Sequence, residues 1–143
     1  MSPGYRFPNT PGKPSEPVKP EDTHALTALT VNSAIAAPSE GAKLKPGAQV
    51  IQGVAWSGEA DITKVEISTD GGASWNATQL GKDQAKYAWR LWSYNWKPAK
   101  SGDYVILSRA TDSQGSAQPD TAVWNPSGYL YNAYDQVKVY VRA

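Results

Sequence analysis

The sequence predicts an all-β fold, an immunoglobulin-like antiparallel β-sandwich of about seven strands preceded by a Pro-rich extended tail. From about Ala25 onward, short runs of alternating apolar and polar residues recur between turn sequences, as in half-buried strands. No segment shows the apolar spacing of an amphipathic helix. With 143 residues, the chain is long enough for one domain with a substantial core.

The N-terminal segment differs in composition from the rest. The first twenty residues hold six of the eleven prolines, and five of them, from Pro8 to Pro20, recur at every third position. A polyproline II helix has about three residues per turn, which predicts an extended spacer over residues 1–25 and a folded domain over residues 26–143. A ligand for a proline-binding domain is the alternative. The segment lacks the charged start and apolar middle of a signal peptide, so we expect no export signal in this chain.

Five strands are expected where the alternation is clearest: Gln49–Trp56, Lys64–Ser68, Tyr87–Trp96, Asp103–Thr111 and Gln136–Arg142. Between them, residues 69–72 (Thr-Asp-Gly-Gly) supply the positive-φ positions of a tight hairpin, with Trp75 beginning the return strand.

The alternation also predicts which side chains are buried. Val65 and Ile67 are expected to face the core, as are the three valines of Gln136–Arg142, while Val50 and Val54 are expected to share one face of their strand. Tyr104 stands near the start of a late strand, where immunoglobulin-like folds often place a corner tyrosine.

Composition excludes several classes of function. Because 14 Lys and Arg stand against 13 Asp and Glu, we expect no nucleic-acid partner bound through its phosphates. No apolar run is long enough to span a bilayer, so we expect no membrane partner. Without cysteine, and with His24 as the one histidine, neither a thiolate site nor a site of several imidazoles can form. We find no catalytic residues, and we expect no metal or cofactor to be bound by this chain.

The aromatic residues are the remaining functional signal. Six Trp and eight Tyr accompany a single Phe, and such amphipathic rings favour interfaces. Aromatics occupy both faces of Tyr87–Trp96, which predicts either that a protein surface or a sugar covers the second face, or that the rings fill a small core. The loop over residues 124–132 is similarly aromatic. The interface candidates are Trp89, Trp92, Trp96, Tyr129 and Tyr131.

Six motifs together carry a family resemblance, and they run in order over residues 28–141: Gly53–Gly58, Val65–Trp75, Ala88–Trp92, Arg109–Asp112, Gln118–Pro119 and Trp124–Gly128. In these the chain resembles the C-terminal dimerisation domain of the sulfite oxidase family of molybdenum enzymes. The segment Gly4–Asn9 resembles the linker between that domain and the catalytic domain before it.

The resemblance implies a sandwich that pairs with its own copy, and a molybdopterin-bearing catalytic domain as a second partner. Because one Cys ligates molybdenum in that family and this chain has none, we expect a non-catalytic dimerisation or assembly domain lacking the molybdopterin-binding domain. Two alternatives are the small subunit of a split molybdenum oxidoreductase and a carbohydrate-binding module that uses exposed aromatics. Bacterial relatives in the family imply a periplasmic location.

The resemblance also assigns the edge of the partner domain's substrate pocket to four loop residues: Trp124, Asn125, Ser127 and Gly128. Eukaryotic sulfite oxidases have a Trp-Asn-x-Arg-Gly loop, whose arginine reaches the anion pocket. Here the matching position is Ser127, and a hydroxyl supplies neither the charge nor the two-pronged geometry of a guanidinium.

Overall fold

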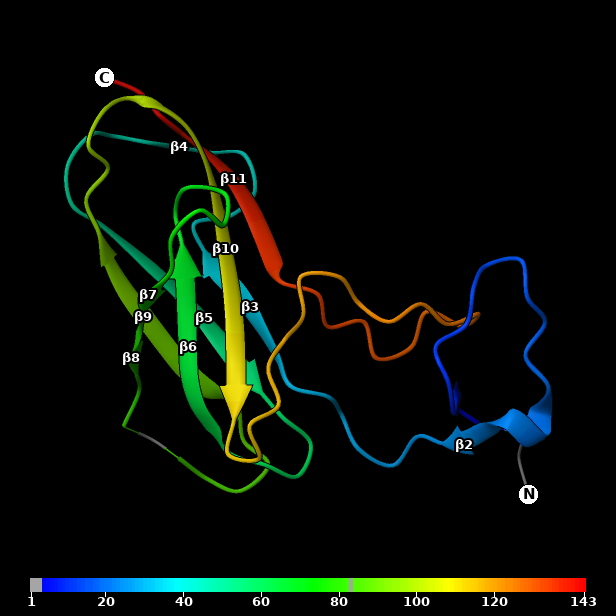
Figure 1. The fold of residues 1–143 in the computed structure, drawn as a ribbon. Coiled ribbons are helices and arrows are strands. Elements are labelled where there is room, and N and C mark those ends of the chain that lie inside the picture. Colours follow the sequence, from blue (N-terminus) through cyan, green and yellow to red (C-terminus); the bar gives the residue numbers. More distant parts are fainter. Residues whose placement is uncertain (1–3, 83) are drawn as a thin grey trace.

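Two β-sheets pack face to face in the computed structural model, which describes residues 4–82 and 84–143 (Figure 1). The sandwich strands are β3 (Asn32–Ala37), β4 (Ala42–Leu44), β5 (Gln49–Trp56), β6 (Ile62–Ser68), β7 (Asn76–Ala77), β8 (Gln79–Leu80), β9 (Arg90–Trp96), β10 (Gly102–Asp112) and β11 (Asp135–Val141). One sheet has the order β4-β11-β10-β6-β7 and the other the order β3-β5-β9-β8. The predicted all-β sandwich is confirmed; one pairing, β4 with β11, is parallel.

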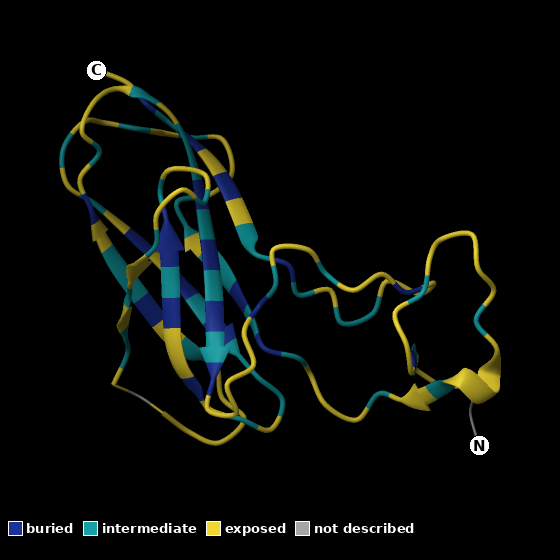
Figure 2. Ribbon diagram, in the orientation of Figure 1, coloured by how far each residue is buried: buried dark blue, intermediate teal, exposed yellow. Residues whose placement is uncertain are grey.

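The core lies between the two sheets and follows the predicted alternation on β6 and β11. Val65 and Ile67 are buried, and so are the three valines of β11. Figure 2 shows the alternation along the strands as bands of buried and exposed residues. On β5, Val50 and Val54 share one face as expected, whereas Ile51 and Ala55 point into the core and Val50 is half exposed. The face carrying Val50 and Val54 is therefore the outer face of the sheet.

Several boundaries differ from the expected ones for local reasons. The Asp70 carboxylate accepts hydrogen bonds from the backbone and hydroxyl of Ser74, which lower the pKa of Asp70 to about 2 and close a loop around the two glycines. The return strand β7 consequently begins at Asn76, one residue after Trp75. The strand expected to begin at Tyr87 instead begins at Arg90, as β9. Tyr87 has φ +63 and lies outside it. The alternation was too short to indicate β3, β4 and β8.

Tyr104 occupies the predicted corner. Its hydroxyl donates a 2.7 Å hydrogen bond to the carbonyl of Lys100, and its ring meets Trp96 edge to face at 4.9 Å. The corner thus fastens the turn between β9 and β10 to the end of the core.

Tyr104→Phe is expected to lower the free energy of unfolding by about 1 kcal/mol, because it removes this hydrogen bond and keeps the ring against Trp96. Urea denaturation measures the change. Tyr87→Phe, at an exposed tyrosine, is the control and should leave stability unaltered. An unaltered midpoint for Tyr104→Phe would contradict the corner's role.

The N-terminal segment is folded back on itself. Strand β1 (Arg6–Pro8) pairs antiparallel with β2 (Thr23–Ala25), which follows the short 3-10 helix η1 (Pro20–Asp22). The sequence predicted that the five periodic prolines form one continuous extended rod. They do not, because the chain folds back and Pro8 lies opposite Thr23. We call residues 4–25 the tail hairpin. It stands apart from the sandwich and meets the loop between β10 and β11 (Figure 1). Among the described residues, no helix is long and apolar enough to cross a membrane.

Candidate functional site

The outer face of the β3-β5-β9-β8 sheet presents apolar side chains to solvent; we call it the apolar face. Val50 on β5 is 51% exposed, Leu91 on β9 is 58% exposed, and Trp89, immediately before β9, is 65% exposed. Trp89 stacks on Trp56 with ring centroids 5.6 Å apart. An exposed surface of this kind is typical of a protein interface.

The outer face of the other sheet is charged. Arg109 on β10 binds Glu66 on β6 at 3.0 Å and lies 4.1 Å from the centre of the Trp75 ring. Lys64 approaches the same carboxylate at 3.2 Å. Burial raises the pKa of Glu66, but the hydrogen bonds and charges of Arg109 and Lys64 outweigh it, so the pKa lies below its usual value. The charges on this face are paired, as suits a sheet face that is exposed to solvent.

Two of the predicted interface residues belong to the core. Trp92 is 3% exposed and Trp96 is 6% exposed, and both indoles pack between the sheets. The sequence placed aromatics on both faces of this strand without distinguishing the faces. Their burial removes Trp92 and Trp96 as surface anchors, whereas Trp89 lies on the apolar face.

Residues 113–134, between β10 and β11, form a second candidate surface, which we call the long loop. The Asn125 side chain is buried; its amide donates to the carbonyl of Tyr129, and its oxygen accepts from the Tyr129 backbone. Gly128 closes this turn at φ +67. Asn125 therefore shapes the loop from within, while Trp124 and Ser127 are exposed at its surface.

The long loop and the tail hairpin together form an outlying lobe. Tyr5 meets Tyr129 edge to face, with ring centroids 5.1 Å apart. A β-carbon at Gly12 would lie 3.5 Å from Cζ3 of Trp124, so the tail hairpin also lies against that indole. Tyr131 is exposed beside them. Residues 120–129 line most of an open groove of about 690 Å³ on the lobe.

A residue that the sequence did not single out by itself, Gln118, holds the long loop to the sandwich. Its Oε1 accepts hydrogen bonds from the backbone of Ala110 at 2.8 Å and from the hydroxyl of Ser33 at 2.6 Å. Its Nε2 donates to Asn32 at 2.9 Å and to the carbonyl of Ala133 at 3.1 Å. Only the family resemblance marked this position, since a lone glutamine has no local signature.

Within residues 4–82 and 84–143, the side chains do not fit a molybdenum or other metal site. The chain has no cysteine, and the described residues include no cluster of three His, Asp or Glu side chains suited to a metal ion. His24 donates to or accepts from Asn9 at 2.9 Å within the tail hairpin. We therefore derive no chemical step from this chain.

Comparison with known proteins identifies the fold's relatives. Residues 23–142 match the family model described as the Mo-co oxidoreductase dimerisation domain. Mitochondrial sulfite oxidase from Mus musculus is 36% identical over 125 residues, covering 82% of this chain and 23% of that protein. The Homo sapiens protein is 35% identical over 134 residues, covering 88% and 25%.

A solved structure agrees with these matches. The sulfane dehydrogenase SoxCD from Paracoccus pantotrophus superposes with a TM-score of 0.69 at 25% identity, covering 80% of this chain and 33% of that one. The chain spans about a quarter of the length of the two sulfite oxidases that it matches.

Proposed function

Because the chain belongs to the family of Mo-co oxidoreductase dimerisation domains, we propose that it pairs with a second copy of itself and has no catalytic activity of its own. The match of the family model to residues 23–142 carries this proposal. The lack of any cysteine supports the second part, since the resemblance assigns the molybdenum ligand to a thiolate. Molybdopterin and the redox chemistry would then belong to a separate catalytic domain or chain.

The outlying lobe is the surface we propose for contact with that catalytic domain. Trp124 and Ser127 lie exposed on the long loop, and Asn125 and Gly128 fix the turn that presents them. Tyr129 meets Tyr5 of the tail hairpin, within the segment Gly4–Asn9 that resembles the interdomain linker. With Ser127 in place of arginine, the loop would bring a neutral hydroxyl to the edge of the substrate pocket. A periplasmic location is proposed from the resemblance to bacterial relatives.

The carbohydrate-binding alternative finds less support in the geometry. A sugar platform needs aromatic rings side by side with free faces. On the apolar face Trp56 and Trp89 instead stack on each other, at an interplanar angle of 29°. One face of the Trp56 ring is thereby covered by protein.

Sedimentation equilibrium of the purified chain tests the pairing. We expect a concentration-dependent dimer between roughly micromolar and hundred-micromolar protein, as for an interface that buries about 1,200–2,000 Å² in total. A strict monomer throughout this range would contradict pairing by this chain. Added polysaccharide should leave the distribution unchanged; a shift would favour the carbohydrate-binding alternative.

A further inference from the structure

The two sheets differ in where they carry charge. Strands β3, β5, β8 and β9 contain one charged residue among them, Arg90, and the alternation along β9 places it on the same side as buried Trp92. The residues directed outward from this sheet are therefore neutral: Ala34, Ala36, Val50, Gln52, Val54, Trp56, Leu91, Ser93 and Asn95. A surface without charge across the full width of a sheet is unusual in water and is characteristic of the centre of an interface.

The opposite sheet has the reverse pattern. Its strands direct Lys64, Arg109 and Lys138 outward, together with Glu66 and Asp103. Covering these groups would remove ion pairs from water, which is costly without new partners. Facing its own copy across a two-fold axis, such a surface would also set some like charges against each other.

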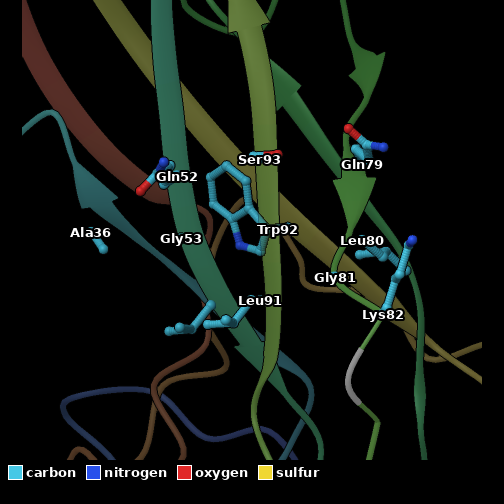
Figure 3. Close-up of a pocket in the computed structure, with 11 residues that line it drawn as sticks. Ala36, Gln52, Gly53, Gln79, Leu80, Gly81, Lys82, Leu91, Trp92 and Ser93 are labelled. Atoms are coloured by element: carbon cyan, nitrogen blue, oxygen red, sulfur yellow. The ribbon is translucent and has the colours of Figure 1, made fainter.

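An open cavity of about 420 Å³ lies beside the centre of the apolar face, between β9 and the β8 edge. Figure 3 shows the Trp92 indole next to Gly53, with Gln52 and Ser93 nearby and Leu80 and Lys82 on the β8 side. The Trp92 Nε1–H is buried, and no residue within the described ranges accepts its hydrogen bond. A buried donor without an acceptor costs about 1–3 kcal/mol.

We propose that the apolar face is the surface through which two copies of this chain pair, which rests on the proposed function. The outward strand residues of this face are neutral, so they can meet their copies across a two-fold axis without charge repulsion; Lys82, which follows β8, is the charged residue that lines the cavity. Val50, Leu91 and Trp89 are its most exposed apolar side chains and would be buried against the partner. The cavity beside Leu91 would receive a side chain of the partner.

Two isosteric substitutions test which sheet pairs. Gln52→Glu places a carboxylate on the apolar face, and Gln136→Glu places the same carboxylate on the charged face; both glutamines are exposed strand residues. In sedimentation equilibrium, Gln52→Glu should raise the dimer dissociation constant about tenfold or more, because each dimer then buries two unpaired carboxylates. Gln136→Glu should leave it within about twofold. Leu91→Glu should weaken the dimer further.

Each outcome has a distinct meaning, provided that circular dichroism shows the variants folded. A wild-type dimer weakened only by Gln136→Glu, or by none of the three substitutions, would overturn the assignment to the apolar face and leave the proposed pairing intact. A wild-type chain that stays monomeric would overturn the proposed pairing and this inference with it.

Discussion

Replacing Gln118 by alanine is expected to lower the free energy of unfolding by about 3 kcal/mol. The side chain is buried and bonds to residues of both sheets and of the long loop. Alanine would leave the Ala110 N–H without this acceptor in the interior, which costs about 1–3 kcal/mol, and the Ser33 hydroxyl would keep only its bond to Ser108. The cavity left by the amide adds to the loss.

Urea denaturation at one fixed protein concentration measures this change, since a dimer's stability depends on concentration. Gln114→Ala is the matched control, because Gln114 is exposed in the same loop and should change stability by less than about 0.5 kcal/mol. Limited proteolysis should also cut the long loop of Gln118→Ala faster than that of the wild type. Two variants of equal stability would show that the Gln118 network does not hold the loop.

The strands whose buried side the sequence predicted best have one solvent-exposed and one buried face. In β11 and β6, lysine or glutamate alternates with valine and isoleucine, so the buried side could be read directly from the charges. In β5 and β9 both faces lack charge, apart from Arg90. Hydrophobicity alone then cannot distinguish a core from an interface, which explains why Trp92 was predicted as an interface residue although it is buried.

Long-range contacts account for what the sequence could not predict. The Gln118 amide bonds to Ser33 and Asn32, which are 85 and 86 residues away in the chain, and Tyr5 near the N-terminus meets Tyr129 in the long loop. Neither pairing leaves a local pattern. The proline period likewise predicted an extended spacer, but the pairing of β1 with β2 decides the path of the tail hairpin. Family resemblance marked Gln118 and Trp124–Gly128 without indicating that Asn125 is buried.

Gly53→Ala is expected to destabilise the sandwich by about 3 kcal/mol, because the structure has no room for a methyl group there. A β-carbon at Gly53 would lie 2.2 Å from the carbonyl oxygen of Ala34 and 2.2 Å from Cζ2 of Trp92. The oxygen belongs to the backbone of the paired strand β3, so it cannot move without disturbing the ladder. Overpacking of this kind typically costs about 1–3 kcal/mol, and here two neighbours must move.

The matched control is Gly102→Ala on β10, where the nearest atom to a new β-carbon is Cε2 of Tyr104 at 3.8 Å. That substitution should leave stability unchanged or raise it by up to about 1 kcal/mol, because alanine restricts the unfolded chain. Thermal unfolding of both variants separates local crowding from a general effect of removing a strand glycine. Gly53 and Trp92 lie opposite each other at the centre of the β3-β5-β9-β8 sheet, which carries the apolar face. Gly53→Ala should therefore also weaken pairing between two copies of the chain. Equal stability of the two glycine variants would mean that the small residue at Gly53 does not determine how the Trp92 indole packs.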